Sequence, residues 1–234
     1  MSDLASDTLR EIAVSVSDEL AARDDVDAVL LVGSVAAGYA DEYSDVDLQV
    51  VGPAEGGQRS VDGVHVEWPP VTTRDIEGNL AGWEDDAALF TYANAELLHD
   101  EVGLGDLLGN YERYPPEIRR KKLYAGWFHG SGEAFDARKA SKRGDYRGQR
   151  CAAVAAVEQF AALVYVLEGR FPPYRSWLFH DLPADLPGID AALDGDIDAL
   201  DRLTDYVASQ LRPALDADRI ENPYLHQPEF GPLG

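Results

Sequence analysis

The chain contains very little cysteine, methionine and lysine: its 234 residues include one cysteine, one methionine and four lysines. A single cysteine, Cys151, excludes an internal disulfide and a two-cysteine metal site. The five histidines show no paired ligand spacing, so nothing in the sequence indicates a zinc site. We therefore expect a cytoplasmic protein, and we expect Cys151, at the head of an alanine-rich helix, to be buried.

Basic residues are also scarce. The chain has 20 Lys and Arg against 43 Asp and Glu, which gives a formal net charge of -23. Such a surface repels nucleic acids and anionic membranes over most of its area, so a nucleic-acid partner is possible only at a local patch and is not favoured. A surface rich in Asp and poor in Lys is typical of proteins that work in concentrated salt, because salt screens the self-repulsion. We predict a halophilic source.

No long uninterrupted apolar run is present. The longest one, residues 151–167, is interrupted by Glu158 and Gln159 and is better interpreted as a buried helix than as a membrane span. The first residues carry acids where an export signal would carry Lys or Arg. We expect neither a membrane anchor nor export.

The periodicity of the apolar residues predicts an α/β (α+β) fold, with a small mixed β-sheet flanked by helices and then an α-helical bundle. Strands are expected at residues 26–32, 46–50, 61–68 and 96–99, and helices at 2–23, 72–83 and 103–111. The character of the chain changes at Tyr114-Pro115-Pro116, after which apolar residues recur at helical spacing, consistent with about four helices. We expect a first domain over residues 1–113, a helical domain over 114–220 and an extended tail over 221–234.

One Asp-x-Asp triplet differs from the others in its surroundings. With 27 aspartates, chance alone gives roughly 3 such triplets, so the five in this chain mean little by themselves. Asp45 and Asp47, however, open a strand in which apolar residues alternate with polar ones, so both carboxylates point to one face. They also follow Gly33-Ser34, which ends a buried strand. Only this triplet has an upstream element suited to phosphate.

This combination suits a nucleoside triphosphate. Gly33 allows the backbone to approach the phosphates, and Ser34 adds a hydroxyl donor. Two carboxylates on one strand face can bind one metal ion or bridge two. Glu67 lies on the matching face of the next predicted strand, opposite Val66, and could supply a third carboxylate.

The spacing of these residues resembles the nucleotidyltransferase superfamily related to DNA polymerase β. The longer stretch GSVAAGYADEYSDVDL, which includes Gly38 and Ser44, is similar to the aminoglycoside and lincosamide nucleotidyltransferases, and the resemblance covers about 35 residues. It implies a polymerase β-like catalytic domain at 1–113 and a substrate-binding helical domain at 114–220. It also implies an NTP co-substrate and two Mg²⁺ ions, with Mn²⁺ as an alternative metal. The residues it implicates are Asp45, Asp47 and Glu67 for metal binding and catalysis, and Gly33, Ser34 and Ser44 for the nucleotide.

The expected reaction is transfer of a nucleoside monophosphate, AMP from ATP, to a hydroxyl of a small molecule with release of pyrophosphate. Glu67 would either hold the second metal ion or accept the proton of the attacking hydroxyl, and the sequence does not decide between these roles. Transfer to a protein, as in toxin–antitoxin pairs, transfer to RNA, and a non-catalytic nucleotide-binding relative stay open as alternatives. A homodimer is equally open.

Eleven of the twenty basic residues lie between Arg113 and Arg150, where only four acids occur. This cluster could clamp phosphates, receive RNA, or pack against acidic surface of the protein. Arg147 and Arg150 open the apolar helix and are the candidates for phosphate contacts.

Overall fold

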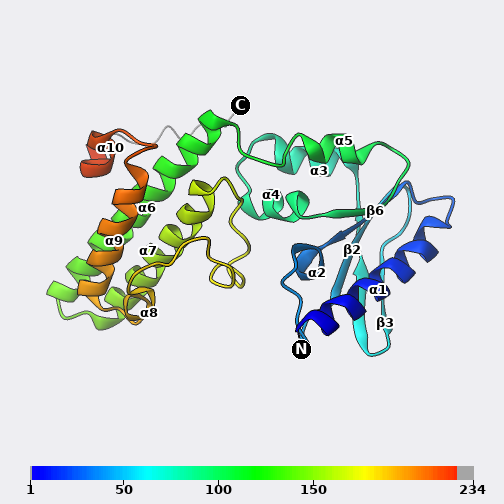
Figure 1. Cartoon of the computed structure of the whole chain (residues 1–234), viewed down its shortest axis with the longest axis horizontal. Helices are drawn as coiled ribbons and strands as arrows, with labels where there is room; N and C mark the ends of the chain where they lie inside the picture. Colours follow the sequence, from blue (N-terminus) through cyan, green and yellow to red (C-terminus); the bar gives the residue numbers. More distant parts are fainter. Residues whose placement is uncertain (1, 226–234) are drawn as a thin grey trace. The chain divides into compact units, whose positions relative to one another are not determined.

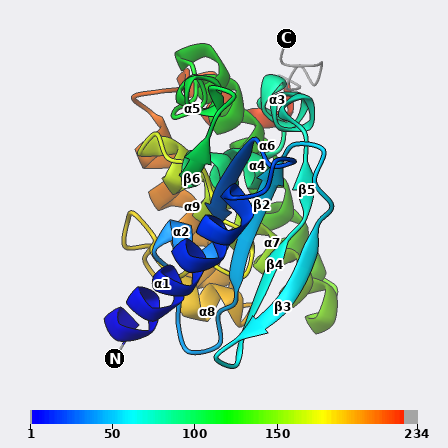
Figure 2. The ribbon, with the colours of Figure 1, turned by 90° about the vertical axis from the view of Figure 1, so that its right-hand side faces the viewer.

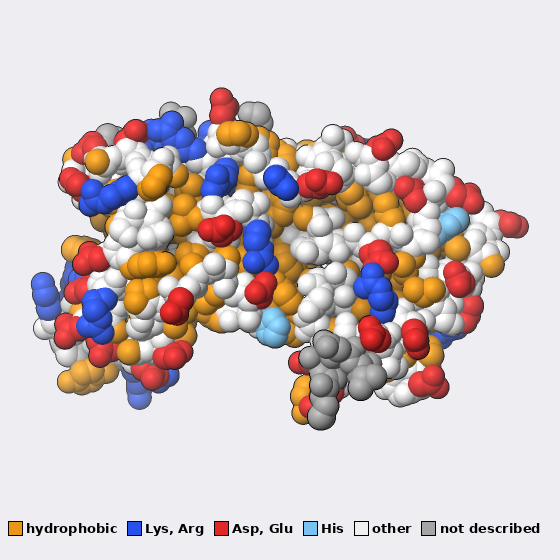
Figure 3. Space-filling model, in the orientation of Figure 1, with side chains coloured by type: hydrophobic (Ala, Val, Ile, Leu, Met, Phe, Trp, Pro, Cys, Tyr) orange, Lys and Arg blue, Asp and Glu red, His pale blue; other side chains and the backbone are white. Residues whose placement is uncertain are grey.

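The structure is a computed structural model that describes residues 2–225 (Figure 1). The chain forms two compact units, one that ends at Arg113 and one that begins at Tyr114. Asp and Glu side chains are spread over the face drawn in Figure 3, as the composition requires.

The first unit is built on a six-stranded mixed sheet, which confirms the predicted fold class. Its strands lie in the order β3-β4-β2-β1-β6, and β5 pairs with β2. β1 is antiparallel to both β2 and β6, whereas β2 is parallel to β4. The strands span Ala28–Val32 (β1), Val46–Val51 (β2), Gly57–Val61 (β3), Val64–Trp68 (β4), Pro70–Val71 (β5) and Glu96–Asp100 (β6).

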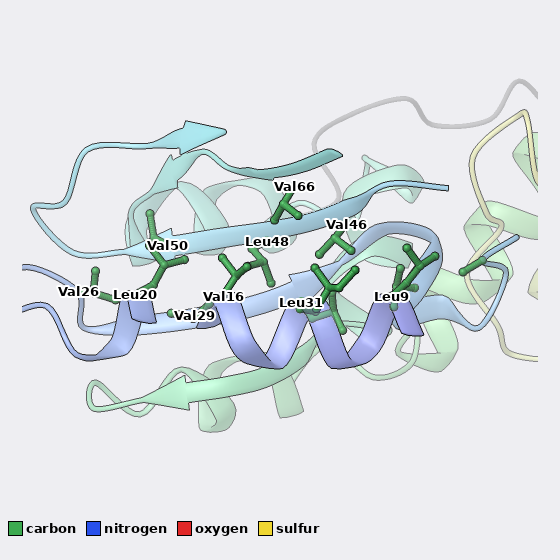
Figure 4. Packing of buried hydrophobic residues seen from close by; sticks show 14 of the residues in the cluster. Leu9, Val16, Leu20, Val26, Val29, Leu31, Val46, Leu48, Val50 and Val66 are labelled. Carbon is green, nitrogen blue, oxygen red and sulfur yellow. The ribbon is translucent and has the colours of Figure 1, made fainter. Parts of the chain in front are cut away.

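Helix α1, Ser2–Ala21, covers one face of this sheet (Figure 2). Its apolar residues recur every three or four positions, so that Leu9, Val16 and Leu20 face the strands (Figure 4). They pack against side chains such as Leu48 and Val66, both fully buried. Because β2 buries its even-numbered residues on this side, its odd-numbered polar residues are left on the opposite face.

Four shorter helices complete the description of the first unit: α2 (Gly33–Ala37), α3 (Thr73–Ala81), α4 (Asp86–Ala93) and α5 (Leu104–Gly109). α3 begins with a capping box, in which the Thr72 Oγ1 accepts a hydrogen bond from the Asp75 backbone N–H at 3.1 Å. α4, which the sequence did not predict, is capped by Asp85, whose Oδ1 accepts from the N–H groups of Ala87 and Ala88.

The predicted single strand at 61–68 is wrong in one respect, because a turn divides it. β3 and β4 form a hairpin whose loop is Asp62-Gly63. Both loop residues have positive φ, 51° and 88°, as a tight hairpin turn with this dipeptide requires. The register of β4 is unaffected, so Val66 is buried on the α1 side and Glu67 points to the other face.

The second unit is helical, with α6 (Pro116–Lys142) and α7 (Tyr146–Leu167) as its long antiparallel pair. Glycines on α6 allow this pair to approach closely. A Cβ at Gly126 would lie 2.8 Å from Leu163, and one at Gly130 would lie 2.6 Å from Phe160. The shorter elements are α8 (Ile189–Leu193), α9 (Ile197–Leu211), α10 (Ala217–Glu221) and the 3-10 helix η1 (Pro223–Leu225).

α7 is the one helix in the described part of the chain that is long and apolar enough to cross a membrane. Half of its apolar stretch is buried inside the protein. It packs on α6, α8 and α9, as a core helix does. Cys151, at its start, is exposed, so the expected burial is wrong. The predicted tail at 221–234 differs at residues 221–225, which end α10 and form η1, and residues 226–234 lie outside the described part.

Candidate active site

The polar face of β2 carries the site. Val46, Leu48 and Val50 are fully buried against α1, while Asp47 and Gln49 are half-buried on the other face. Asp45 stands one residue before the strand and is exposed. The alternation thus directs Asp45 and Asp47 to one side of the sheet.

Glu67 is the direct neighbour of Asp47 across the sheet. β2 and β4 are parallel, and their register pairs Asp47 with Glu67 and Val46 with Val66. Two carboxylate side chains therefore leave the sheet from adjacent strands at the same level and on the same face. Like charges placed this way repel each other unless a proton or a cation lies between them.

The electrostatics of Asp47 reflect this arrangement. The pKa of its carboxyl group is raised to about 6, chiefly by burial and further by the charges of Asp45 and Glu67, while His65 acts in the opposite direction. The ionised form of Asp47 is therefore unfavourable in the protein alone. A bound cation would reverse this, because it favours the charged carboxylate.

Gly33 lies directly against Asp47. It follows β1, has φ +71° and starts α2, whose C-cap is Gly38. A Cβ on Gly33 would lie 3.0 Å from the Asp47 Cγ and closer still to its Oδ2. Residue 33 must be glycine for two reasons: the backbone conformation favours it, and the carboxylate of Asp47 occupies the space of a side chain.

Ser34 and Ser44 stand at the two ends of the segment between β1 and β2. Ser34 is half-buried in α2, and its carbonyl accepts a hydrogen bond from the Tyr39 N–H at 2.8 Å. The Ser44 hydroxyl accepts from the Asp41 N–H at 2.9 Å and donates to the Asp41 Oδ1 at 3.1 Å. Ser44 thereby closes the turn that precedes Asp45.

The carboxylates fit a divalent cation whose coordination a substrate completes. Among the described residues, no group of three or more His, Cys, Asp or Glu side chains is assembled as a metal site. Mg²⁺, however, is usually held by one or two carboxylates together with substrate phosphates and water. Asp47 is the oxygen ligand best suited to such a cation, because the positive charge would stabilise its ionised form, which burial and the charges of Asp45 and Glu67 disfavour.

Two features of this face involve residues that are not among the predicted site residues. The His65 Nε2 lies 4.0 Å from the Glu67 Oε2, with both side chains about half exposed. The Tyr92 hydroxyl of α4 donates a hydrogen bond of 3.1 Å to the Gln49 Oε1. Gln49 belongs to the same alternation as Asp45 and Asp47, and this period-two pattern was the signal that could have identified it.

Arg147 and Arg150 belong to the other compact unit, at the start of α7. Arg150 forms an ion pair with Asp194 at 3.1 Å. Arg147 is exposed and has no interaction partner among the described residues.

Several other bases of the 113–150 cluster are engaged within their own unit. Arg119 donates to the carbonyls of Val166 and Leu167 at the end of α7. Arg120 pairs with Asp216 and Arg138 with Asp201. These contacts account for part of the cluster by packing against acidic residues and the ends of helices.

Comparisons with known proteins find matches for both parts of the chain. Residues 13–101 match the family model described as "Nucleotidyltransferase domain", and residues 84–178 match "Domain of unknown function (DUF4037)". No match was found among curated proteins. Eleven chains of solved structures match, among them a nucleotidyltransferase-like protein from Exiguobacterium sibiricum 255-15. That protein is 15% identical, with a TM-score of 0.47 over 88% of this chain and 78% of its own.

The nucleotidyltransferase model covers β1, the Gly33-Ser34 turn, β2 and β4. Every residue that the sequence implicates in the first unit therefore lies inside the matched segment. The match confirms the predicted resemblance to the nucleotidyltransferase superfamily, while the narrower likeness to the aminoglycoside and lincosamide enzymes stays a prediction; over residues 13–101 the chain carries a nucleotidyltransferase domain.

Proposed function

We propose that the protein is a Mg²⁺-dependent nucleotidyltransferase that transfers AMP from ATP to a hydroxyl group of a small molecule and releases pyrophosphate. The observation that carries this proposal is the pairing of Asp47 with Glu67 directly beside Gly33. The nucleotidyltransferase domain itself supports an NTP as substrate. The nucleobase, the acceptor and the metal are parts of the proposal.

Asp45 and Asp47 would hold the metal ion, and Mn²⁺ could replace Mg²⁺ there. When bound, the cation supplies neutralisation of the triphosphate charge and orients the α-phosphate. The backbone at Gly33-Ser34 and the hydroxyl of Ser34 would bind phosphate oxygens, because glycine at position 33 has no side chain that would block their approach. Ser44 would act indirectly, by stabilising the turn before Asp45 through its hydrogen bond with Asp41.

In the reaction, the acceptor oxygen forms a bond to the α-phosphorus while the bond to pyrophosphate breaks. The hydroxyl proton has to leave the acceptor, and the Glu67 carboxylate is half-exposed on the reactive face, where it could accept that proton. If Glu67 instead holds a second metal ion, another base takes the proton. The imidazole of His65, whose Nε2 lies 4.0 Å from the Glu67 Oε2, could then accept it.

The location and assembly of the protein follow as lesser proposals. We propose a cytoplasmic protein of a halophile, in agreement with the net charge of -23. Arg147 remains available to bind phosphate, whereas Arg150 would first have to leave Asp194. A homodimer, a protein or RNA acceptor, and a nucleotide sensor without catalysis are the alternatives.

The experiment is a transfer screen. The protein is incubated in high salt with Mg²⁺ and each α-labelled NTP, together with a small-molecule pool, a cell-protein extract or total RNA. We expect label from ATP in the small-molecule fraction. Label in protein or RNA would replace the acceptor part of the proposal, and binding of Mg·ATP without any labelled product would favour the sensor.

A further inference from the structure

The amide group of Gln49 uses its oxygen in a hydrogen bond within the protein, whereas its NH2 group is not engaged. Its Oε1 accepts the hydrogen bond from the Tyr92 hydroxyl at 3.1 Å. Its Nε2 carries two N–H donors and has no hydrogen-bond partner among the described residues. This nitrogen is not buried and is therefore accessible to solvent. The amide thus presents its donors to the solvent side of the polar face of β2.

Tyr92 is well anchored for this task. Tyr92 is 7% exposed and lies on α4, which also carries the buried Phe90. The Phe90 ring stacks on Tyr39, with ring centroids 6.0 Å apart, and the Tyr39 N–H donates to the carbonyl of Ser34. α4 therefore contacts both segments that carry the site: the loop that follows α2, through Tyr39, and the strand β2, through Gln49.

Gln49 stands two residues from Asp47 on the same strand face, at a spacing of about 7 Å between Cα atoms. If Asp47 binds the metal ion at the α-phosphate, that phosphorus carries the pyrophosphate group on one side and the ribose on the other. The proposed phosphate-binding turn, Gly33-Ser34, follows Val32, the strand partner of Asp47, whereas Gln49 pairs with Leu30, farther from that turn. Gln49 therefore lies on the side left for the ribose. Its hydroxyl oxygens accept hydrogen bonds, and the free N–H donors of Gln49 are the matching chemistry.

We propose that Gln49, oriented by Tyr92, donates a hydrogen bond to a ribose hydroxyl of the bound nucleotide and so selects ribonucleotides over one class of deoxynucleotides. This inference rests on the proposed function. A purely structural bond would need only the Oε1, which satisfies the buried Tyr92 hydroxyl. The accessible amide NH2 group, which has no partner among the described residues, is the part that points to a ligand.

The test measures the affinities of ATP, 2′-deoxyATP and 3′-deoxyATP by calorimetry in Mg²⁺, for wild type, Gln49→Met and Tyr92→Phe. Methionine keeps the length of the side chain and removes the donors. Gln210→Met, at an exposed glutamine of α9, is the matched control. Thermal melts without nucleotide establish that each variant is folded.

We expect wild type to bind ATP about 3- to 10-fold more tightly than one of the two deoxy analogues, the ratio that one neutral hydrogen bond gives. Gln49→Met should abolish this ratio, Tyr92→Phe should reduce it, and Gln210→Met should keep it. The inference is overturned if wild type and Gln49→Met show the same ratios. If wild type binds none of the three nucleotides, the proposed function itself is contradicted, and this inference fails with it.

Discussion

Asp47 and Glu67 occupy paired positions on two parallel strands, with Gly33 packed against the Asp47 carboxylate. This arrangement places negative charge where the protein alone does not favour it, and it leaves no room for a side chain at residue 33. Both features follow if the face is built to hold a cation and a phosphate chain. In the simpler alternative, the carboxylates are only part of an acidic surface.

Conversion of Asp47 to asparagine should change how stability depends on pH. The pKa of Asp47 is raised to about 6, so between about pH 4, where an unperturbed carboxyl ionises, and pH 6 the folded protein holds more protons than the unfolded one. The contribution of this group to stability therefore falls as the pH rises through that window. After allowance for its partial exposure, we expect Asp47→Asn to be about 1 kcal/mol more stable than wild type at pH 7.5 and not at pH 4.

Urea denaturation of both proteins at the two pH values, without divalent metal and at constant salt, measures this difference. Added Mg²⁺ should stabilise wild type more than the variant. If the stability of wild type and Asp47→Asn depends on pH in the same way, the ionised form of Asp47 does not destabilise the protein and the prediction is contradicted.

Gly33 and Gly38 offer a matched pair of substitutions. Both have positive φ, +71° and +76°, so alanine at either position costs about 1–3 kcal/mol of backbone strain. Only at Gly33 does the added Cβ meet Asp47, whereas nothing lies within 4 Å at Gly38. Gly33→Ala should therefore weaken Mg·ATP binding at least about 10-fold, the effect of losing one charged contact, while Gly38→Ala changes stability alone.

Calorimetric titration of both variants, each verified as folded, checks this. Equal loss of affinity in the two variants would mean that general strain in the segment, and not the position of the carboxylate, controls binding.

Much of this site could be predicted from the sequence, because alternation along a strand fixes which side chains share a face. Period two predicted correctly that Asp47 and Glu67 leave neighbouring strands on one face. The turn at Asp62-Gly63 carried a recognisable hairpin dipeptide inside a predicted strand and was missed. The contact between Tyr92 and Gln49 joins residues 43 positions apart, and no local pattern reveals such a pairing.

The phosphate role predicted for the start of α7 is open to a direct test. Arg147 has no partner among the residues that the structure describes, whereas Arg150 is paired with Asp194. If Arg147 contacts phosphate, Arg147→Ala should weaken Mg·ATP binding about 10-fold, as loss of one charge-assisted hydrogen bond does. Arg150→Ala should have a smaller effect. Unchanged affinity in both variants would assign these residues to the surface of their own unit.

The salt dependence of stability tests the halophilic interpretation. With a net charge of -23, repulsion within the folded chain should fall as the Debye length shrinks from about 10 Å at 0.1 M salt to about 3 Å at 1 M. The melting temperature should therefore rise with KCl up to molar concentrations. A melting temperature that is flat or falls over this range would contradict the prediction.

The most direct measurement is pyrophosphate release together with transfer of α-labelled nucleotide, for wild type and for Asp45→Asn/Asp47→Asn, with and without Mg²⁺. We predict metal-dependent transfer by wild type and a loss of about 1000-fold or more in the variant, because several kcal/mol of transition-state stabilisation depend on the cation. Transfer at similar rates by both proteins would contradict the account, since the carboxylates beside Gly33 would then take no part in the reaction.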